Sequence, residues 1–205
     1  MMKTRAEIKE AAKQGFRSNY WVCVGVMVLF GLIVGASGAT GVLAILLVGP
    51  LTCGLNSFSV KVQRDEPVDA GTMFADGFFQ FWRKVGGYWY QMLFTFLWTL
   101  LFVIPGIVKS YAYSQQLYIL ADCPDVTATA SLELSKRMMN GHKWELFVLE
   151  LSFLGWELLS ILTFGILEVF YVVPYFQQAK AEYYLQLKEE CLRTGVVSAQ
   201  ELYPL

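Results

Sequence analysis

The stretch YWYQMLFTFLWTLLFVI, residues 88–104, holds no charged side chain over seventeen consecutive positions. After Pro105 and Gly106, a second apolar run with one charge, Lys109, continues from Ile107 to Ala121. A helix needs about 20 residues to cross the ~30 Å hydrocarbon layer of a membrane, and its backbone polar groups must be satisfied internally. This stretch therefore predicts a helical hairpin in a membrane, with its turn at the Pro-Gly step.

The same pattern recurs along the whole 205-residue chain, which is 56% hydrophobic and 16% charged. Soluble domains carry roughly 45–50% apolar and ~25% charged residues. The apolar runs do not alternate with polar residues, which argues against a membrane β-barrel. We predict an all-α polytopic membrane bundle of six transmembrane helices: Tyr20–Val34, Gly41–Val60, Tyr88–Ile104, Ile107–Ala121, Trp144–Leu162 and Ile166–Leu185.

Basic residues give this threading an orientation. Fifteen of the sixteen Lys and Arg residues fall on one side, and Lys109 is the exception. Excess Lys and Arg marks the cytoplasmic side, so both termini are predicted to be cytoplasmic. Three hairpin turns without charges then face outward: Gly35–Thr40, Pro105-Gly106 and Thr163–Gly165.

An amphipathic segment precedes each hairpin. These segments are Thr4–Phe16, which opens with a capping box of Thr4 and Glu7, then Thr72–Lys84 and Thr127–Asn140. Helices of this kind lie in the headgroup plane of a bilayer. We therefore expect one membrane domain built from three related units, residues 1–62, 63–122 and 123–205.

Several kinds of site are disfavoured by composition. The net charge of −1 predicts no nucleic-acid partner. The four cysteines are scattered without CxxC spacing, and His142 is the only histidine, so we expect reduced cysteines and neither a metal nor another cofactor. No nucleotide-binding or nucleophile motif is present, so we expect no catalytic residues and no enzyme activity.

Polar side chains inside apolar runs are the first candidate site. Charged groups in a bilayer cost about 2.5–3.5 kcal/mol each on insertion scales, so each needs a reason. A polar seam with Lys109 paired to Glu157 or Glu168 is one interpretation, and snorkelling to the interfaces or a single structural pair is the other. The seam comprises Lys109, Glu150, Glu157, Glu168, Gln115, Gln116 and Gln177.

Basic residues beside aromatic ones are the second candidate site. They are suited to anionic lipid headgroups, although ordinary positive-inside bias also places them there. Gly31 and Gly35 form a GxxxG pair, which suits helix packing and, less often, self-association. The headgroup candidates are Arg83, Lys84, Lys136, Arg137, His142 and Lys143.

Residues 70–187 resemble an uncharacterised integral-membrane family of bacteria, a domain of unknown function common in Gram-positive genomes. The residues that carry the resemblance include Ile104-Pro105-Gly106-Ile107, Ala121-Asp122 with Pro124, Gly141-His142-Lys143, Gly155-Trp156 and Pro174-Tyr175. A more distant similarity is to the membrane domain of some glycerophosphodiester phosphodiesterases, whose catalytic barrel is absent here. The resemblance implies a multi-pass protein of the bacterial cytoplasmic membrane and no particular reaction.

These observations favour a non-enzymatic envelope module that engages membrane lipids or a partner membrane protein, which could be a second copy. A small transporter or permease subunit using the polar seam is an alternative. A membrane-embedded lipid-modifying enzyme is a second alternative, for which Asp122, Asp125 and His142 are the candidate residues.

Overall fold

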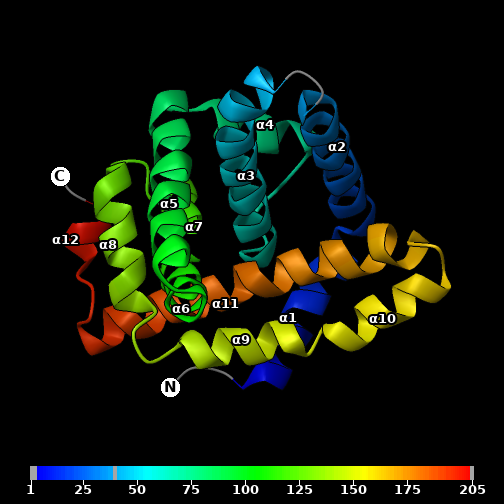
Figure 1. The fold of residues 1–205 in the computed structure, drawn as a ribbon. Coiled ribbons are helices and arrows are strands. Elements are labelled where there is room, and N and C mark those ends of the chain that lie inside the picture. Colours follow the sequence, from blue (N-terminus) through cyan, green and yellow to red (C-terminus); the bar gives the residue numbers. More distant parts are fainter. Residues whose placement is uncertain (1–3, 39–40, 204–205) are drawn as a thin grey trace.

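The computed structural model describes residues 4–38 and 41–203, and these residues form helices and turns without a strand. The all-α prediction is confirmed. Helices α2, α3 and α5 lie side by side, and the long helix α11 runs across them (Figure 1). Helix α1 packs against α11, and α9 and α10 run below α11 in this view.

Helix α1 spans Arg5–Ser18, and Thr4 caps it through the predicted capping box with Glu7. Its apolar stripe of Ile8, Ala12 and Phe16 is buried. That stripe faces α11, where Tyr175 donates its hydroxyl to the Lys9 carbonyl at 3.0 Å. The amphipathic helix is therefore present as predicted, but protein covers its apolar face and leaves little of it for a membrane surface.

The first predicted hairpin is formed by α2 (Tyr20–Gly38) and α3 (Val42–Gln63). Residues 39 and 40 of the predicted Gly35–Thr40 turn lie outside the described residues. By length and composition, only these two of the described helices can cross a membrane. Helix α2 is apolar, and only 28% of its most apolar window is buried, so it contributes one face to the core and leaves the rest uncovered by the described chain.

The second amphipathic segment is shorter than predicted. Helix α4 spans Ala70–Phe78, with Asp69 as its N-cap. The helix is interrupted at Phe79 and at Gln80, whose φ is +51°. The predicted single segment Thr72–Lys84 is therefore wrong, because its last residues begin α5, Phe81–Leu101. This break places Arg83 and Lys84 on a new helix axis.

The second hairpin turns earlier than predicted. Helix α5 ends at an extended residue, Phe102, and α6 (Val103–Tyr113) begins directly after it. Pro105 lies in the first turn of α6, where the missing N–H costs nothing, so the predicted turn at Pro105-Gly106 is wrong. The run Ile107–Ala121 is also divided, since α7 (Gln116–Asp122) follows a turn at Ser114 and Gln115.

The last third of the chain begins with α8, Ala128–Met138, which Thr127 caps. The run Trp144–Leu162 forms two helices, α9 (Lys143–Leu151) and α10 (Leu154–Leu162). The predicted turn at Thr163–Gly165 is present, with left-handed residues at Phe164 and Gly165. A π-helical turn, Glu168–Val172, then leads into α11 (Val173–Thr194) and the short helix α12 (Ala199–Leu202).

Six transmembrane helices are not supported in the described part of the chain. Helices α6, α9 and α10 have 11, 9 and 9 residues, about half of what a straight crossing needs. The sequence pattern identified apolar runs correctly, but it did not show where the backbone interrupts them.

The core lies where α1, α2, α3, α7, α9 and α11 meet. At one end of the core, the Phe16 ring contacts the rings of Tyr20, Tyr171 and Tyr175, at centroid distances of 5.2, 5.8 and 6.3 Å. Outside this core, large apolar side chains stay exposed along α5 and α6 and along α10 and the turn after it.

Candidate functional site: a basic pocket

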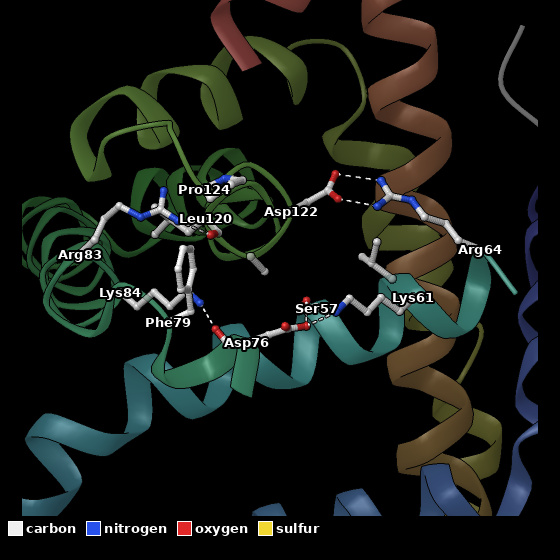
Figure 2. A pocket seen from close by; sticks show the side chains of 12 residues that line it. Ser57, Lys61, Arg64, Asp76, Phe79, Arg83, Lys84, Leu120, Asp122 and Pro124 are labelled. Atoms are coloured by element: carbon white, nitrogen blue, oxygen red, sulfur yellow. Dashed lines mark hydrogen bonds and ion pairs between the residues drawn. The ribbon is translucent and has the colours of Figure 1, made fainter. Parts of the chain in front are cut away.

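A pocket of about 240 Å³ opens between α3, α4, α5 and α7 (Figure 2). Four basic side chains and two carboxylates face it, together with a smaller number of apolar residues. We call it the basic pocket. Its lining residues are Ser57, Val60, Lys61, Arg64, Asp76, Phe79, Arg83, Lys84, Leu120, Ala121, Asp122 and Pro124.

Two glycines set the distance between α3 and α4. A Cβ added at Gly54 would lie 2.1 Å from the Met73 carbonyl oxygen and 2.9 Å from the Gly77 Cα. A Cβ added at Gly77 would lie 2.9 Å from the Pro50 carbonyl oxygen. The two backbones can approach this closely only because neither residue has a side chain. The close contact brings Asp76 of α4 against the last turns of α3.

Asp76 forms one side of the basic pocket. Its carboxylate lies 2.6 Å from Lys61 Nζ and accepts a hydrogen bond of 2.6 Å from the Ser57 hydroxyl. Its carbonyl oxygen accepts a hydrogen bond from Lys84 Nζ. The Lys84 side chain is buried, at 2% exposure.

Asp122 forms the opposite side. Its carboxylate accepts hydrogen bonds from the two terminal guanidinium nitrogens of Arg64, at 2.6 and 3.0 Å, and it also forms an ion pair with Lys188. The Tyr184 hydroxyl donates to it at 3.0 Å. Burial by itself would raise the pKa of Asp122, but the hydrogen bonds and charges of Arg64 and Lys188 outweigh burial and lower it.

Arg83 lies at the carboxyl end of α7. Its guanidinium donates to the carbonyl oxygens of Leu120 at 2.6 Å, of Cys123 at 3.1 Å and of Val126. The last carbonyls of a helix have no intrahelical partner, so a cation there stabilises the helix end. Arg83 Nε is buried and has no hydrogen-bond partner among the described residues.

The predicted polar seam does not form one continuous path. Lys109 Nζ lies 4.6 Å from the centre of the Trp98 ring, across the α5–α6 turn. Within residues 4–38 and 41–203, no ion pair joins Lys109 to Glu157 or Glu168, so the predicted pairing is wrong. Glu157 is exposed on α10, and the Oε2 of Glu168 is buried without a hydrogen-bond partner.

The remaining seam residues divide into two groups. Glu150 accepts a hydrogen bond of 2.7 Å from the Tyr111 hydroxyl. Gln177 donates to Asn56 Oδ1 at 2.9 Å and to the Tyr118 hydroxyl at 3.3 Å. The first contact links α6 to α9, the other two link α11 to α3 and α7, and all three are typical of interhelical hydrogen bonds.

Gln115 and Gln116 belong to the second group, beside α5 and α8. The backbone N–H of Gln115 donates to the Ser135 hydroxyl at 3.1 Å. The Gln116 side chain donates to the carbonyl oxygens of Gly87 at 3.1 Å and of Ala128 at 3.3 Å. Both glutamines thus tie helices together.

The headgroup candidates separate in the same way. Only Arg83 and Lys84 lie in the basic pocket. Lys136 pairs with Glu133 at 3.2 Å, Arg137 with Glu201 at 2.7 Å, and His142 Nδ1 lies 2.9 Å from Glu145. Lys143 borders a largely apolar groove beside Trp144 and Phe147.

Gly31 and Gly35 have no atom within 4 Å of an added Cβ. Among residues 4–38 and 41–203, the GxxxG pair therefore does not pack α2 against another helix. Packing within the chain, which the sequence favoured for this pair, is not what the structure shows.

Sequence reasoning missed Lys61, Arg64, Asp76 and Lys188 as members of a site, and it considered Asp122 only for an enzyme. These residues lie on four separate helices and show no common spacing. Their one local signal is that Lys61 and Arg64 end an otherwise apolar helix. Among the described residues, no group of three or more His, Cys, Asp or Glu side chains could hold a metal ion.

Comparison with known proteins gives one match. The model of a family described as "Protein of unknown function (DUF975)" matches residues 83–191, just over half of the chain. No curated protein and no solved structure matches. The similarity to glycerophosphodiester phosphodiesterases therefore stays a prediction. The matched segment contains Arg83, Lys84, Asp122 and Lys188, whereas Lys61, Arg64 and Asp76 precede it.

Proposed function

We propose that this chain, which belongs to the DUF975 family of proteins of unknown function, is a multi-pass membrane protein that acts as a non-enzymatic module engaging bilayer lipids. The family has no known reaction. In this proposal the α2–α3 hairpin crosses the bilayer, and the exposed apolar faces of the α5–α6 and α10–α11 hairpins contact its hydrocarbon. The short arms of the last two hairpins would then insert as pairs of helices supported by the rest of the bundle.

One observation carries the proposal, namely the amount of large apolar surface left uncovered on these hairpins. Soluble monomers rarely expose apolar patches larger than a few hundred Å². Here Phe164 is 98% exposed at the tip of one hairpin and Ile104 is 76% exposed near the tip of another. Burial of such side chains in hydrocarbon contributes roughly 1.5–3 kcal/mol each. The exposed apolar residues on these hairpins include Leu97, Leu100, Leu101, Phe102, Val103, Leu158, Leu159, Ile161, Leu162 and Ile166.

The other two functions are less well supported by the geometry. A transporter needs a connected polar path, and the seam residues divide into separate groups in the described part of the chain. For a lipid-modifying enzyme, Asp122 is engaged by Arg64 and Lys188, while His142 is paired with Glu145. Neither arrangement presents an unoccupied acid–base pair.

Insertion is tested in bacterial cells that make the full chain. We expect the protein to stay with membranes after an alkaline carbonate wash. A Phe164→Cys variant should react with a membrane-impermeant maleimide from outside, because residue 164 lies in a turn predicted to face outward. The four native cysteines are buried and should add no background labelling. The matched control Val196→Cys, which is 45% exposed after α11, should react only after permeabilisation. Release by alkali, or labelling of both variants from the same side, would contradict the proposal.

Lipid engagement is tested by native mass spectrometry on the gently extracted protein. Retained phospholipid would support the lipid module. A stoichiometric protein partner without lipid would instead favour a module that engages another membrane protein. A bare monomer would count against both.

A further inference from the structure

The basic pocket holds more positive charge than its acids can neutralise. Its lining includes four cationic side chains and two carboxylates, which leaves two positive charges in excess. Each carboxylate is already occupied. Asp76 is paired with Lys61, and Asp122 is shared between Arg64 and a cation outside the lining, Lys188. Glu66 and Asp125 act on Arg64 and Arg83 from outside the pocket lining.

Lys84 and Arg83 are the two cations without a carboxylate of their own. Lys84 is 2% exposed, and its ammonium group donates a hydrogen bond to a backbone carbonyl, that of Asp76. Arg83 contacts three backbone carbonyls, and its buried Nε has no partner among the described residues. Buried charges are normally paired, because an unpaired charge in a low-dielectric site is costly. Among the described residues, neither of these two cations forms an ion pair with a carboxylate.

We infer that the basic pocket binds a phosphate-class anion, either the phosphate of a lipid headgroup or a free phosphate. Guanidinium and ammonium groups converging on one small cavity suit a tetrahedral anion with several acceptor oxygens. The volume of about 240 Å³ fits a headgroup or a small phosphorylated molecule and is below the usual size of a drug-like ligand site.

The surroundings of the pocket suit the lipid source. Lys61 and Arg64 lie at the end of α3, the candidate membrane span Leu43–Gln63, which is the level of headgroups if that helix crosses a bilayer. Next to Arg83, Trp82 is 74% exposed, and Phe79 of the pocket lining is 57% exposed. Exposed aromatic side chains beside basic ones are typical of the membrane–water interface.

The test compares three forms of the full chain in detergent: wild type, Lys84→Met and Lys136→Met. Lys84→Met removes the buried amine and keeps a chain of similar length, so it should fold at least as well as wild type. Lys136→Met is the matched control, since Lys136 is half exposed and paired only with Glu133. One arm adds inorganic phosphate, with chloride at the same ionic strength as its control. The other arm adds phosphatidylglycerol and counts retained lipid by native mass spectrometry.

We expect wild type and Lys136→Met to bind one of the two probes, and Lys84→Met to bind it at least about tenfold more weakly. Stabilisation by inorganic phosphate beyond that by chloride identifies a free phosphate. Retention of phosphatidylglycerol without a response to phosphate identifies a headgroup. Binding of neither probe, or equal binding by Lys84→Met and wild type, would overturn the inference.

The lipid arm rests on the proposed membrane function, and the phosphate arm does not. A protein that alkali releases from membranes but that responds to phosphate through Lys84 would refute only membrane insertion. A protein that stays in membranes but binds neither probe would refute only the pocket assignment.

Discussion

Asp122 is the buried carboxylate that neutralises two cations, Arg64 and Lys188. Its side chain is 4% exposed and faces Arg64 and the equally buried Lys188. Asp122→Asn leaves both cations without their counter-charge, and loss of one partner from a buried pair typically costs about 3–5 kcal/mol. We therefore expect a loss of that size in the free energy of unfolding at neutral pH, measured by denaturant unfolding in detergent.

The matched control is Glu133→Gln, which breaks an exposed pair with Lys136. Exposed pairs contribute about 0–1 kcal/mol, so this variant should stay close to wild type. Equal effects of the two substitutions would mean that the Asp122 pair does not stabilise the fold.

The lowered pKa of Asp122 also predicts a pH dependence. A carboxylate whose folded pKa is below its unfolded pKa stabilises the fold above the unfolded value, about 3.9, and loses that contribution as pH falls through the folded value. Wild type should therefore lose stability below about pH 4 more steeply than Asp122→Asn. The variant should keep some acid dependence, because Asp69 and Glu201 also have lowered pKa values. Parallel curves in thermal unfolding scans would contradict this assignment.

At the scale of single residues, the sequence predicted part of the site. Arg83 and Lys84 stood out because two adjacent cations follow an aromatic segment, and both line the pocket. Their partners could not be predicted, since contacts between α3, α4, α7 and α11 depend on tertiary packing. Lys109 was misassigned for a related reason. The predicted threading places Lys109 at the same membrane level as Glu157 and Glu168. In the structure, the turn at Phe102 brings the Trp98 ring next to the Lys109 ammonium group instead.

Among the elements, α3 and α4 approach each other closely at Gly54 and Gly77. A methyl group at Gly54 would lie 2.1 Å from the Met73 carbonyl oxygen, so the helices must separate. We expect Gly54→Ala to destabilise the protein by about 1–3 kcal/mol or more, and to open the basic pocket by moving Asp76. Denaturant unfolding measures the loss of stability.

Gly86→Ala is the control for Gly54→Ala. It lies in α5 with nothing within 4 Å of an added Cβ. Alanine favours a helix over glycine by about 0.5–1 kcal/mol, so this variant should be slightly more stable than wild type. A Gly54→Ala protein as stable as Gly86→Ala would show that the two helices are less tightly packed than in the structure.

Two helix beginnings were predicted: the capping box of Thr4 and Glu7 opens α1, and α8 begins one residue after Thr127, the start of the predicted segment. The caps at Asp69 and Ser198 were not predicted. The interruptions at Gln80, Phe102 and Phe153 had no such signal, since glycine or proline stands at none of these positions. Periodicity of apolar residues continues through each interruption, so the pattern predicted longer helices than the backbone forms.

At the scale of the whole molecule, the exposed apolar surface leads to a prediction about insertion. Leu158 lies in the middle of α10 and is 58% exposed. A lysine near the centre of a bilayer costs about 2.5–3.5 kcal/mol, so Leu158→Lys should keep the α10 hairpin from inserting. We expect the Phe164→Cys site to lose its reaction with external maleimide when the two substitutions are combined.

The control for this insertion experiment is Val196→Lys, which places the same charge on an exposed apolar residue outside the hairpins. Labelling at position 164 should be unchanged in that background. Unchanged labelling with Leu158→Lys would show that α10 does not lie in hydrocarbon.

The packing of α1 on α11 has a consequence for how the protein is made. Residues 5–18 leave the ribosome well before residues 173–194, the helix that covers their apolar face. At about 5–20 residues per second, translation needs roughly ten to thirty seconds to supply that partner. During this interval Ile8, Ala12 and Phe16 have no cover from α11, and a nascent amphipathic helix with a free apolar face adsorbs to a bilayer surface. We therefore expect α1 to occupy the membrane surface for a short time before it closes the finished bundle.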